Sequence, residues 1–293
     1  MTTTSDADLR TAILSDLRAM VVAHGDFLPR SMLLEYRLDG VAMPLIDYSR
    51  GIRNPRQLDA TLSVVTSPDG PYEDSTDLGG VWLYAYRAGS DDGDNARLRR
   101  ARELGVDIIL FRKVSTGIYH PIFPMRVTHD DRAARVFTIA MADVAGIAES
   151  EAPTVIEREW AERLVRTRVH QPEFRRAVLS AYGSRCAVCR LRHSELLDAA
   201  HIISDKDDWG DAEVPNGLAL CKIHHAAYDN NFLGITRDYE VRINRRLLAE
   251  VDGPMLRHGL QEMHGTTIHE PTRKVDKPAR DRLDRRFDEF SNA

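Results

Sequence analysis

The chain has 293 residues, with 40 Lys and Arg, 45 Asp and Glu, and 3 Cys. At roughly 100–200 residues per domain, this length predicts two domains. The formal net charge of −5 argues against a uniformly basic nucleic-acid coat, and the odd number of cysteines argues against a disulfide framework. The first 30 residues lack a signal-peptide pattern and no run of about 18 apolar residues is present, so we expect a cytoplasmic protein with no membrane partner.

The N-terminal half changes from one helix to a series of short strands. Apolar side chains at helical spacing predict an amphipathic helix over residues 5–24, within a first segment of residues 1–30. From 31 to 140, apolar runs alternate with Gly and Pro turn signals, which predicts a β-rich domain with a curved sheet or barrel. The predicted strands lie at 43–48, 62–66, 81–86, 108–111, 119–127 and 136–140. Two short helices are expected among them, one beginning near Asn54-Pro55 and one over 94–104.

The second half begins after a small, acidic segment at 141–155, which we interpret as a linker. A second domain is expected at 156–250, followed by an extension at 251–293. Helical patterns lie at 156–168, 172–182 and 279–290. The fold class is therefore expected to be α+β.

All three cysteines belong to one metal-binding pattern. Cys186 and Cys189 form a C-x2-C pair, and after 31 residues Cys221 and His224 form a C-x2-H pair. Two such pairs bring together the four ligands that a tetrahedral Zn²⁺ ion requires. Four protein ligands leave no open position, so this zinc is expected to be structural rather than catalytic. The alternative is that these are ordinary buried thiols.

A second pattern lies between and after the two pairs. The segment LLDAAHII predicts a strand that carries His201, and VPNGLALC places Asn216 before a second strand. His225 and Asp229 then lie in a predicted helix. Residues from about 172 to 250 thus resemble the HNH, or ββα-metal, nuclease family. The matching pieces are FRRAVLSAYGSRCAVC, DAAHII, VPNGLALCKIHHAAYD and NNFLGI.

The resemblance implies a zinc-stapled ββα-metal domain and a role for each of these residues. His201 is expected to be the general base that deprotonates water, and His225 a ligand of a catalytic Mg²⁺ or similar divalent ion such as Mn²⁺. Asn216 is expected to hold the loop that orients His201. Many family members have Asp or His immediately before the base, where this chain has Ala200, so either Asp198 or Asp229 supplies the missing ligand or the metal is held more loosely. The alternative for Asp229 is a structural role, such as a hydrogen bond to the hairpin.

An arginine-rich window precedes and overlaps this pattern. Residues 163–192 contain eight Arg and one Glu, an excess of about +7 in a chain of net charge −5. Such a window is typical of a face that contacts DNA phosphates, although a solvated helix face is the alternative. The candidates for phosphate contacts are Arg166, Arg168, Arg175, Arg176 and Arg185.

The β-rich domain resembles the SRA domains of the PUA-like superfamily. The resemblance rests on PYEDSTDLGGVWLYAYRAGSDDGDNARLRRA at 71–101 and VDIILFRKVSTGIYHPIFPMRV at 106–127. It implies that the domain binds DNA and flips a modified cytosine into a pocket with aromatic and carboxylate side chains. Tyr86 is the first candidate for stacking and Asp91 or Asp92 for reading the base edge, with Tyr48, Tyr84 and Tyr119 as further candidates. The alternatives are a core face for the aromatic residues and a turn or helix cap for the two aspartates.

Together these patterns predict a modification-dependent restriction endonuclease. The N-terminal domain is expected to recognise 5-methyl- or 5-hydroxymethylcytosine in double-stranded DNA, and the C-terminal domain to cut nearby. Because one HNH site cuts one strand, a double-strand break is expected to require a homodimer or two successive nicks. The alternatives are an HNH nicking enzyme without a modification preference and a non-catalytic zinc-stabilised DNA-binding protein.

Overall fold

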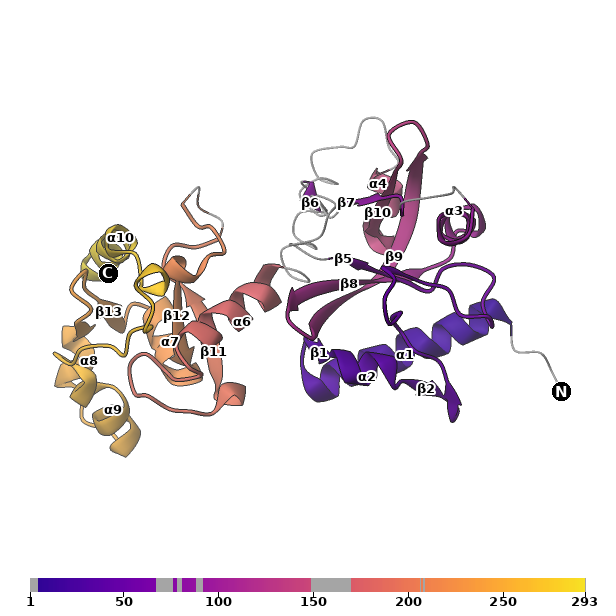
Figure 1. Cartoon of the computed structure of the whole chain (residues 1–293). Helices are drawn as coiled ribbons and strands as arrows, with labels where there is room; N and C mark the ends of the chain where they lie inside the picture. The colour runs from indigo at the N-terminus through magenta and orange to yellow at the C-terminus, as the bar shows by residue number, and fades with distance from the viewer. Residues whose placement is uncertain are drawn as a thin grey trace. The chain divides into compact units, whose positions relative to one another are not determined.

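The computed structural model describes residues 5–66, 76–77, 81–87, 92–148, 170–205, 207 and 209–292. The chain divides into two compact units, residues 1–169 and 170–293, and each has its own hydrophobic core. Both contain helices and strands (Figure 1), which confirms the α+β fold class. None of the described helices is both long and apolar enough to cross a lipid bilayer.

The N-terminal unit is built around one curled eight-stranded sheet with the order β4-β5-β8-β9-β10-β7-β6, in which β1 also pairs with β9. Its strands are β1 (Leu28–Pro29), β4 (Ile52–Arg53), β5 (Ser63–Thr66), β6 (Thr76–Asp77), β7 (Val81–Ala85), β8 (Ile108–Ser115), β9 (Ile118–Asp131) and β10 (Val136–Met141). Only the β5–β8 pair is parallel among the pairings of this sheet, and the long β8–β9 hairpin forms its centre.

Both faces of this sheet are covered, which explains the continuous apolar run in β8. Ile108 and Leu110 belong to one core with Leu98 of α3 (Asp94–Leu104), whereas Ile109 and Phe111 belong to another with Ile13 of α1 (Asp6–His24). Alternating side chains of a strand point to opposite faces, so a strand that is buried on both faces is apolar throughout. The remaining elements are α2 (Arg30–Leu34), β2 (Arg37–Leu38), β3 (Val41–Ala42), η1 (Ala142–Val144) and α4 (Ala145–Ala148).

Three predictions for this unit are wrong. Residues 43–48 are not a strand, because Leu45 is buried and bonds to the carbonyl of Leu33 outside any strand ladder. Residues after Asn54 form a turn instead of a helix, because the Asn54 side chain bonds to Asp94 and Thr61 instead of capping. The linker does not begin at 141, because β10, η1 and α4 extend to 148 with Val144 buried in the core. The helix predicted at 156–168 lies outside the described residues.

The C-terminal unit is built on a ββα arrangement. β11 (Leu197–His201) and β12 (Gly217–Cys221) pair antiparallel in a register that places His201 opposite Gly217, and α7 (Lys222–Asp229) follows directly. The other elements are α6 (Gln171–Ala181), η3 (Ser194–Leu196), η4 (Val214–Asn216), β13 (Leu233–Ile235), β14 (Val241–Ile243), α8 (Arg245–Ala249), α9 (Pro254–Gly259), η5 (Gln261–Met263), η6 (Lys274–Asp276) and α10 (Arg280–Ser291).

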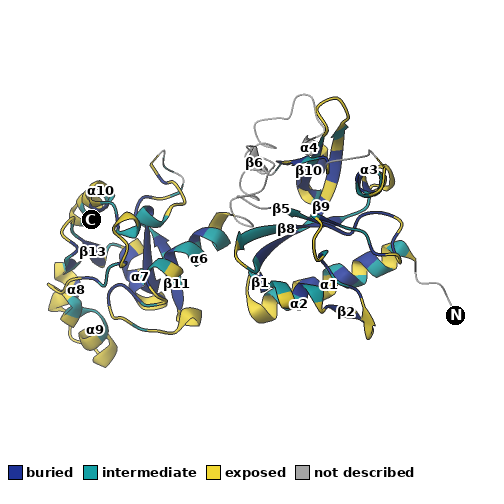
Figure 2. Cartoon of the chain, in the orientation of Figure 1, coloured by how far each residue is buried: buried dark blue, intermediate teal, exposed yellow. Residues whose placement is uncertain are grey.

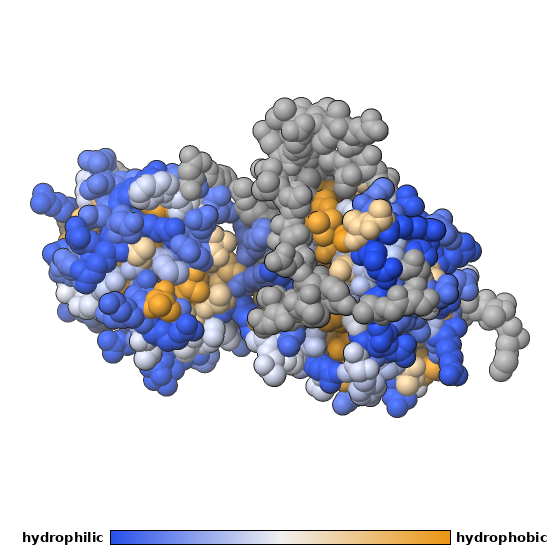
Figure 3. Space-filling model, turned by 45° about the horizontal axis from the view of Figure 1, so that its top comes forward, coloured by the Kyte–Doolittle hydropathy of each residue, from blue (hydrophilic) through white to orange (hydrophobic). Residues whose placement is uncertain are grey.

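Two glycines let helices pack directly on these strands. A Cβ at Gly217 would overlap Val178 of α6, and one at Gly234 of β13 would overlap Phe290 of α10. The helix α10 is therefore part of the second unit rather than a detached extension, and its Leu283 is buried in the same core as β11 and β12. Burial alternates along the helices of both units (Figure 2), and the visible surface of the described residues is mostly hydrophilic with small apolar areas (Figure 3).

The helix α1 is attached to the sheet by a buried arginine. Arg10, which is only 4% exposed, donates to the carbonyls of Ala60, Thr61 and Asp107 and pairs with Asp6 at 2.5 Å. These bonds connect the first helix to the chain segments that lead into β5 and β8.

We expect Arg10→Ala to lower the free energy of unfolding of the N-terminal unit by about 3 kcal/mol, because it leaves buried carbonyls without donors and Asp6 without a partner. Hydrogen exchange of peptides from β5 and β8, followed by mass spectrometry, measures the loss. Arg18→Ala, an exposed arginine of the same helix, is the matched control. Equal exchange in the two variants would contradict the assignment.

Candidate functional site

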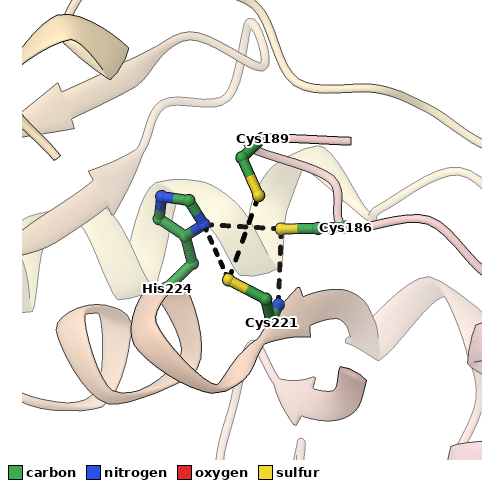
Figure 4. Close-up of side chains that lie close together, drawn as sticks. All are labelled: Cys186, Cys189, Cys221 and His224. Carbon is green, nitrogen blue, oxygen red and sulfur yellow. Dashed lines mark hydrogen bonds between the residues drawn. The ribbon is translucent and has the colours of Figure 1, made fainter. Parts of the chain in front are cut away.

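The predicted zinc ligands lie together in the C-terminal unit. Ligand atoms of Cys186, Cys189, Cys221 and His224 are all within 4.8 Å of one another (Figure 4). The sulfurs of Cys189 and Cys221 are 3.9 Å apart, and a tetrahedral zinc ion bound at about 2.3 Å holds two sulfurs about 3.8 Å apart. The cluster therefore fits a single metal ion such as zinc.

Hydrogen bonds from neighbouring groups orient the ligand atoms of this cluster. The Nδ1 atom of His224 faces the sulfurs of Cys221 at 3.1 Å and Cys186 at 3.5 Å. Its other nitrogen, Nε2, is 2.7 Å from the carbonyl of Gly259 and donates to it, which leaves Nδ1 as the free lone pair. The backbone N–H of Cys221 also donates to the sulfur of Cys186 at 3.3 Å, which helps to hold this sulfur in the cluster.

The histidine next to the cluster faces a different environment. Successive residues of a helix point about 100° apart, so His224 lies in the metal cluster while its neighbour His225 lines a cavity of about 660 Å³. The cavity is also lined by His201 at the end of β11 and by residues of α6 and α10. One short helix thus connects the metal cluster with the wall of the cavity.

His201 is held in this wall by an aromatic stack. The ring of Phe174 on α6 lies over the His201 ring with centroids 4.0 Å apart and planes inclined by 14°. Burial lowers the pKa of His201 below its ordinary value, against the opposing effect of Asp205 and Asp229, so the ring is neutral at pH 7. Its Nε2 has no hydrogen-bond partner among the described residues. A neutral imidazole with a free nitrogen can accept a proton from water.

Asn216 fixes the backbone next to His201. It is fully buried, its side-chain oxygen accepts from the N–H of Ile203 at 2.9 Å, and its amide donates to the carbonyls of Ile203 and Asp211 at 2.9 and 3.1 Å. The backbone carbonyl of Asn216 accepts from Ile202. These bonds hold both ends of the loop between β11 and β12, and therefore the position of His201 at the end of β11.

His225 lies between two carboxylates. Its Nδ1 is 3.5 Å from Asp198 on β11, and its Nε2 is 3.3 Å from Asp229 one turn later on α7. Asp198 is further paired with Lys222 at 2.5 Å, and this hydrogen bond together with His225 outweighs burial and holds the pKa of Asp198 below its usual range. Ala200 is fully buried in the core, so a carboxylate at that position would not reach the cavity without burying a charge.

The structure separates the predicted phosphate-contacting arginines. Arg175 lines the cavity from α6, where it donates to the carbonyls of Ser194 and Leu197, while Arg176 and Arg185 are not among its lining residues. Arg166 and Arg168 lie outside the described residues. Sequence reasoning gave no role to Phe174, although this residue begins the matching segment FRRAVLSAYGSRCAVC, and it missed Arg286; both residues also form the cavity wall.

The aromatic residues predicted for a base pocket lie mostly in the core of the N-terminal unit. Tyr86 is 3% exposed, stacks on Phe137 and bonds to Asp130. Tyr84 and Tyr119 are also buried, as a core face would require, so these three rings do not form an open pocket. Tyr48 is 71% exposed. Asp92 is exposed in the turn before α3, and Asp91 lies outside the described residues.

One family model matches part of the second unit. The model of the HNH endonuclease family HNH_2 matches residues 186–236, which include both cysteine pairs, His201, Asn216 and His225. No curated protein matches the sequence.

Several solved structures are similar to parts of the chain, and they include two restriction endonucleases and an SRA domain. The modification-dependent TagI restriction endonuclease is 17% identical over 83% of this chain and 86% of its own, with a TM-score of 0.31. The SUVH5 SRA domain in complex with hemi-methylated CG DNA is 18% identical over 32% and 74%, with a TM-score of 0.26. The phosphorothioation-dependent restriction endonuclease ScoMcrA is 15% identical over 62% and 48%, with a TM-score of 0.23. TM-scores below 0.5 do not establish a shared fold.

We expect the purified protein to contain one zinc ion per chain, measured by atomic spectrometry. Cys186→Ala should abolish zinc binding and unfold the C-terminal unit, because a structural metal supplies folding free energy directly. Hydrogen exchange should show protection lost in β11, β12 and α7 but kept in β8 and β9. A folded, metal-free Cys186→Ala variant would contradict a structural role.

We expect His201→Ala to reduce DNA cleavage at least about 100-fold, because it removes the proton acceptor next to the cavity. DNA affinity, measured in EDTA by fluorescence anisotropy, should stay within about twofold of wild type. His193→Ala, an exposed histidine at the turn before β11, is the control and should cleave normally. Full activity of His201→Ala would remove this residue from the mechanism.

Proposed function

We propose that the chain is a metal-dependent DNA endonuclease that cuts double-stranded DNA close to a modified cytosine, because residues 186–236 match the model of an HNH endonuclease family. The observation that supports the cutting reaction is that His201, whose buried Nε2 has no hydrogen-bond partner among the described residues, lines the same cavity as the His225–Asp229 pair. Hydrolysis of a phosphodiester needs a proton acceptor for the attacking water and positive charge at the phosphate.

We assign the proton acceptor to His201. It is neutral because burial lowers its pKa, and Phe174 together with the bonds of Asn216 fixes the direction of its ring. A water that attacks the phosphorus gives its proton to Nε2 as the new P–O bond forms, and the bond to the 3′ oxygen breaks. The fixed ring means that no reorientation is required at this step.

We assign the catalytic metal ligands to His225 Nε2 and Asp229, which lie 3.3 Å apart on one helix face. A divalent ion such as Mg²⁺ or Mn²⁺ supplies charge stabilisation at the phosphate and the leaving oxygen when it is bound. Asp198 contacts the opposite nitrogen of the same ring, so we assign it to orienting His225 rather than to the metal. Lys222 and Arg175 hold Asp198 in turn.

We assign substrate recognition to the N-terminal unit. The proposal rests on the resemblance of residues 71–127 to SRA domains, which implies reading of 5-methyl- or 5-hydroxymethylcytosine by base flipping. Within the predicted aromatic set, Tyr48 has the exposed ring that stacking on DNA requires. Its backbone carbonyl accepts from Arg30 at 2.6 Å, which places one cation suited to a phosphate beside this residue, whereas Arg50 two residues later pairs with Asp47 and Asp94 at 3.6 Å.

Cleavage of matched plasmids tests this function. We expect plasmid DNA with 5-methylcytosine or 5-hydroxymethylcytosine to be cut in Mg²⁺ or Mn²⁺, with unmodified DNA cut at least about tenfold more slowly and no cutting in EDTA. Tyr48→Ala should reduce the preference about tenfold, because base stacking contributes roughly 1–3 kcal/mol. Val22→Ala, which removes another exposed apolar side chain of this unit, is the control.

The same assay separates the other functions. Equal cutting of modified and unmodified DNA would show an HNH nicking enzyme without modification preference, and no cutting with any divalent ion would show a non-catalytic DNA-binding protein. Because one site cuts one strand, we also propose that two copies of the chain act together. Linear product without a nicked intermediate, and a dimer on DNA in sedimentation experiments, support this arrangement.

A further inference from the structure

The C-terminal helix α10 contributes a side chain to the catalytic cavity. Arg286 of α10 is one of the cavity-lining residues, about 50 residues beyond the matched HNH segment at 186–236. The helix is held firmly, because Leu283 is fully buried and Phe290 packs on Gly234 of β13. The position of Arg286 is therefore fixed by the core of the unit.

The hydrogen bonds of Arg286 leave its charge available. Its guanidinium donates to the carbonyl of Tyr228 at 2.6 Å and to the side-chain oxygen of Asn231 at 2.7 Å, and both acceptors are uncharged. The carboxylate paired with it is that of Glu289, at 3.7 Å and 58% exposed. A guanidinium carries more N–H donors than these two bonds use.

The other arginines of α10 have a different surrounding. Arg282 pairs with Glu213 at 2.8 Å, and Arg285 pairs with Asp207 at 2.6 Å, both on the loop between β11 and β12. Their charges are matched by close carboxylates, so they attach the helix to the loop. Arg286 differs from Arg282 and Arg285 because the two groups that accept its hydrogen bonds are neutral, and its paired carboxylate, that of Glu289, is more distant.

The cavity wall carries more carboxylates than arginines, so a negatively charged phosphate needs cations there to offset the repulsion. Its wall contains two arginines, Arg175 from α6 and Arg286 from α10. The carboxylates of the wall are those of Asp198, Asp205, Asp207, Asp229 and Glu289. A divalent ion offsets only part of this excess, and a DNA strand adds one negative charge per phosphate. Arg175 is itself 3.7 Å from Asp198, which further reduces its free charge.

We propose that Arg286 binds a backbone phosphate of the DNA strand that enters the catalytic cavity. This inference rests on the proposed endonuclease function and adds to it a substrate contact from outside the HNH segment. Two neutral acceptors hold the guanidinium at the cavity wall and use only part of its N–H donors, so donors remain for the oxygens of a phosphate. The positive charge of Arg286 would therefore be paired with a phosphate when DNA is bound.

Single neutral phosphates test this contact. The cutting site is first mapped with wild type, and then DNA duplexes are made with one methylphosphonate at each position within three phosphates of it. In wild type, neutralising the contacted phosphate should slow cleavage about tenfold. In Arg286→Gln, which keeps an amide donor for Tyr228 but no charge, cleavage of ordinary DNA should fall about tenfold and this methylphosphonate should cause no further loss.

Two controls complete the test. Arg280→Ala, an exposed arginine of the same helix that pairs with Asp238, should keep wild-type rates and the wild-type methylphosphonate profile. The salt dependence of DNA binding should fall by about one unit of slope in Arg286→Gln only. An unchanged methylphosphonate profile in Arg286→Gln would overturn the inference, whereas absence of cutting by wild type would instead refute the endonuclease function.

If Arg286→Gln does not fold, chemical modification of the wild-type protein tests whether Arg286 contacts DNA. Phenylglyoxal modifies arginine side chains, and mass spectrometry reports the rate at each one. Bound DNA in EDTA should slow the modification of Arg286 but not of Arg280. Equal rates at Arg286 with and without DNA would show that it only caps the end of α7.

Discussion

The ββα arrangement depends on the cluster of three cysteines and one histidine. Cys186 lies before β11, Cys221 ends β12, and His224 lies in the first turn of α7. A metal bound to all of them would join two strands and a helix and add folding free energy to the core that they share. Because His225 is the next residue after His224, the same constraint also sets where the proposed ligands of the catalytic metal lie.

The catalytic cavity combines local and distant parts of the second unit. His201, His225 and Asp229 come from the ββα arrangement itself, whereas Phe174 and Arg175 come from α6 and Arg286 from α10. The close approach at Gly217 and Gly234 allows these two helices to contact the strands directly. The side chains that line the cavity are therefore held in place by the packing of α6 and α10 on the strands.

Much of this site follows from local spacing in the sequence. The C-x2-C and C-x2-H pairs, and the order of His201, Asn216 and His225, are short-range patterns, and for this reason they are visible without a structure. Tyr84 of β7 and Tyr86, which follows this strand, show the opposite case. Alternation correctly places Tyr84 and Tyr86 on one face, but only the packing of α3 shows that this face is covered. Arg286 is invisible in the sequence because its neighbours lie more than 50 residues away.

The stack of Phe174 on His201 sets a limit on how this nuclease can be separated from its partner unit. A fragment that begins at the first zinc ligand, Cys186, would contain the whole HNH segment but lack α6. It would lose the ring that stacks on His201, the Val178 side chain that covers Gly217, and Arg175 at the cavity wall. A separated C-terminal fragment therefore needs the whole of residues 170–293, and a fusion partner has to be joined before α6.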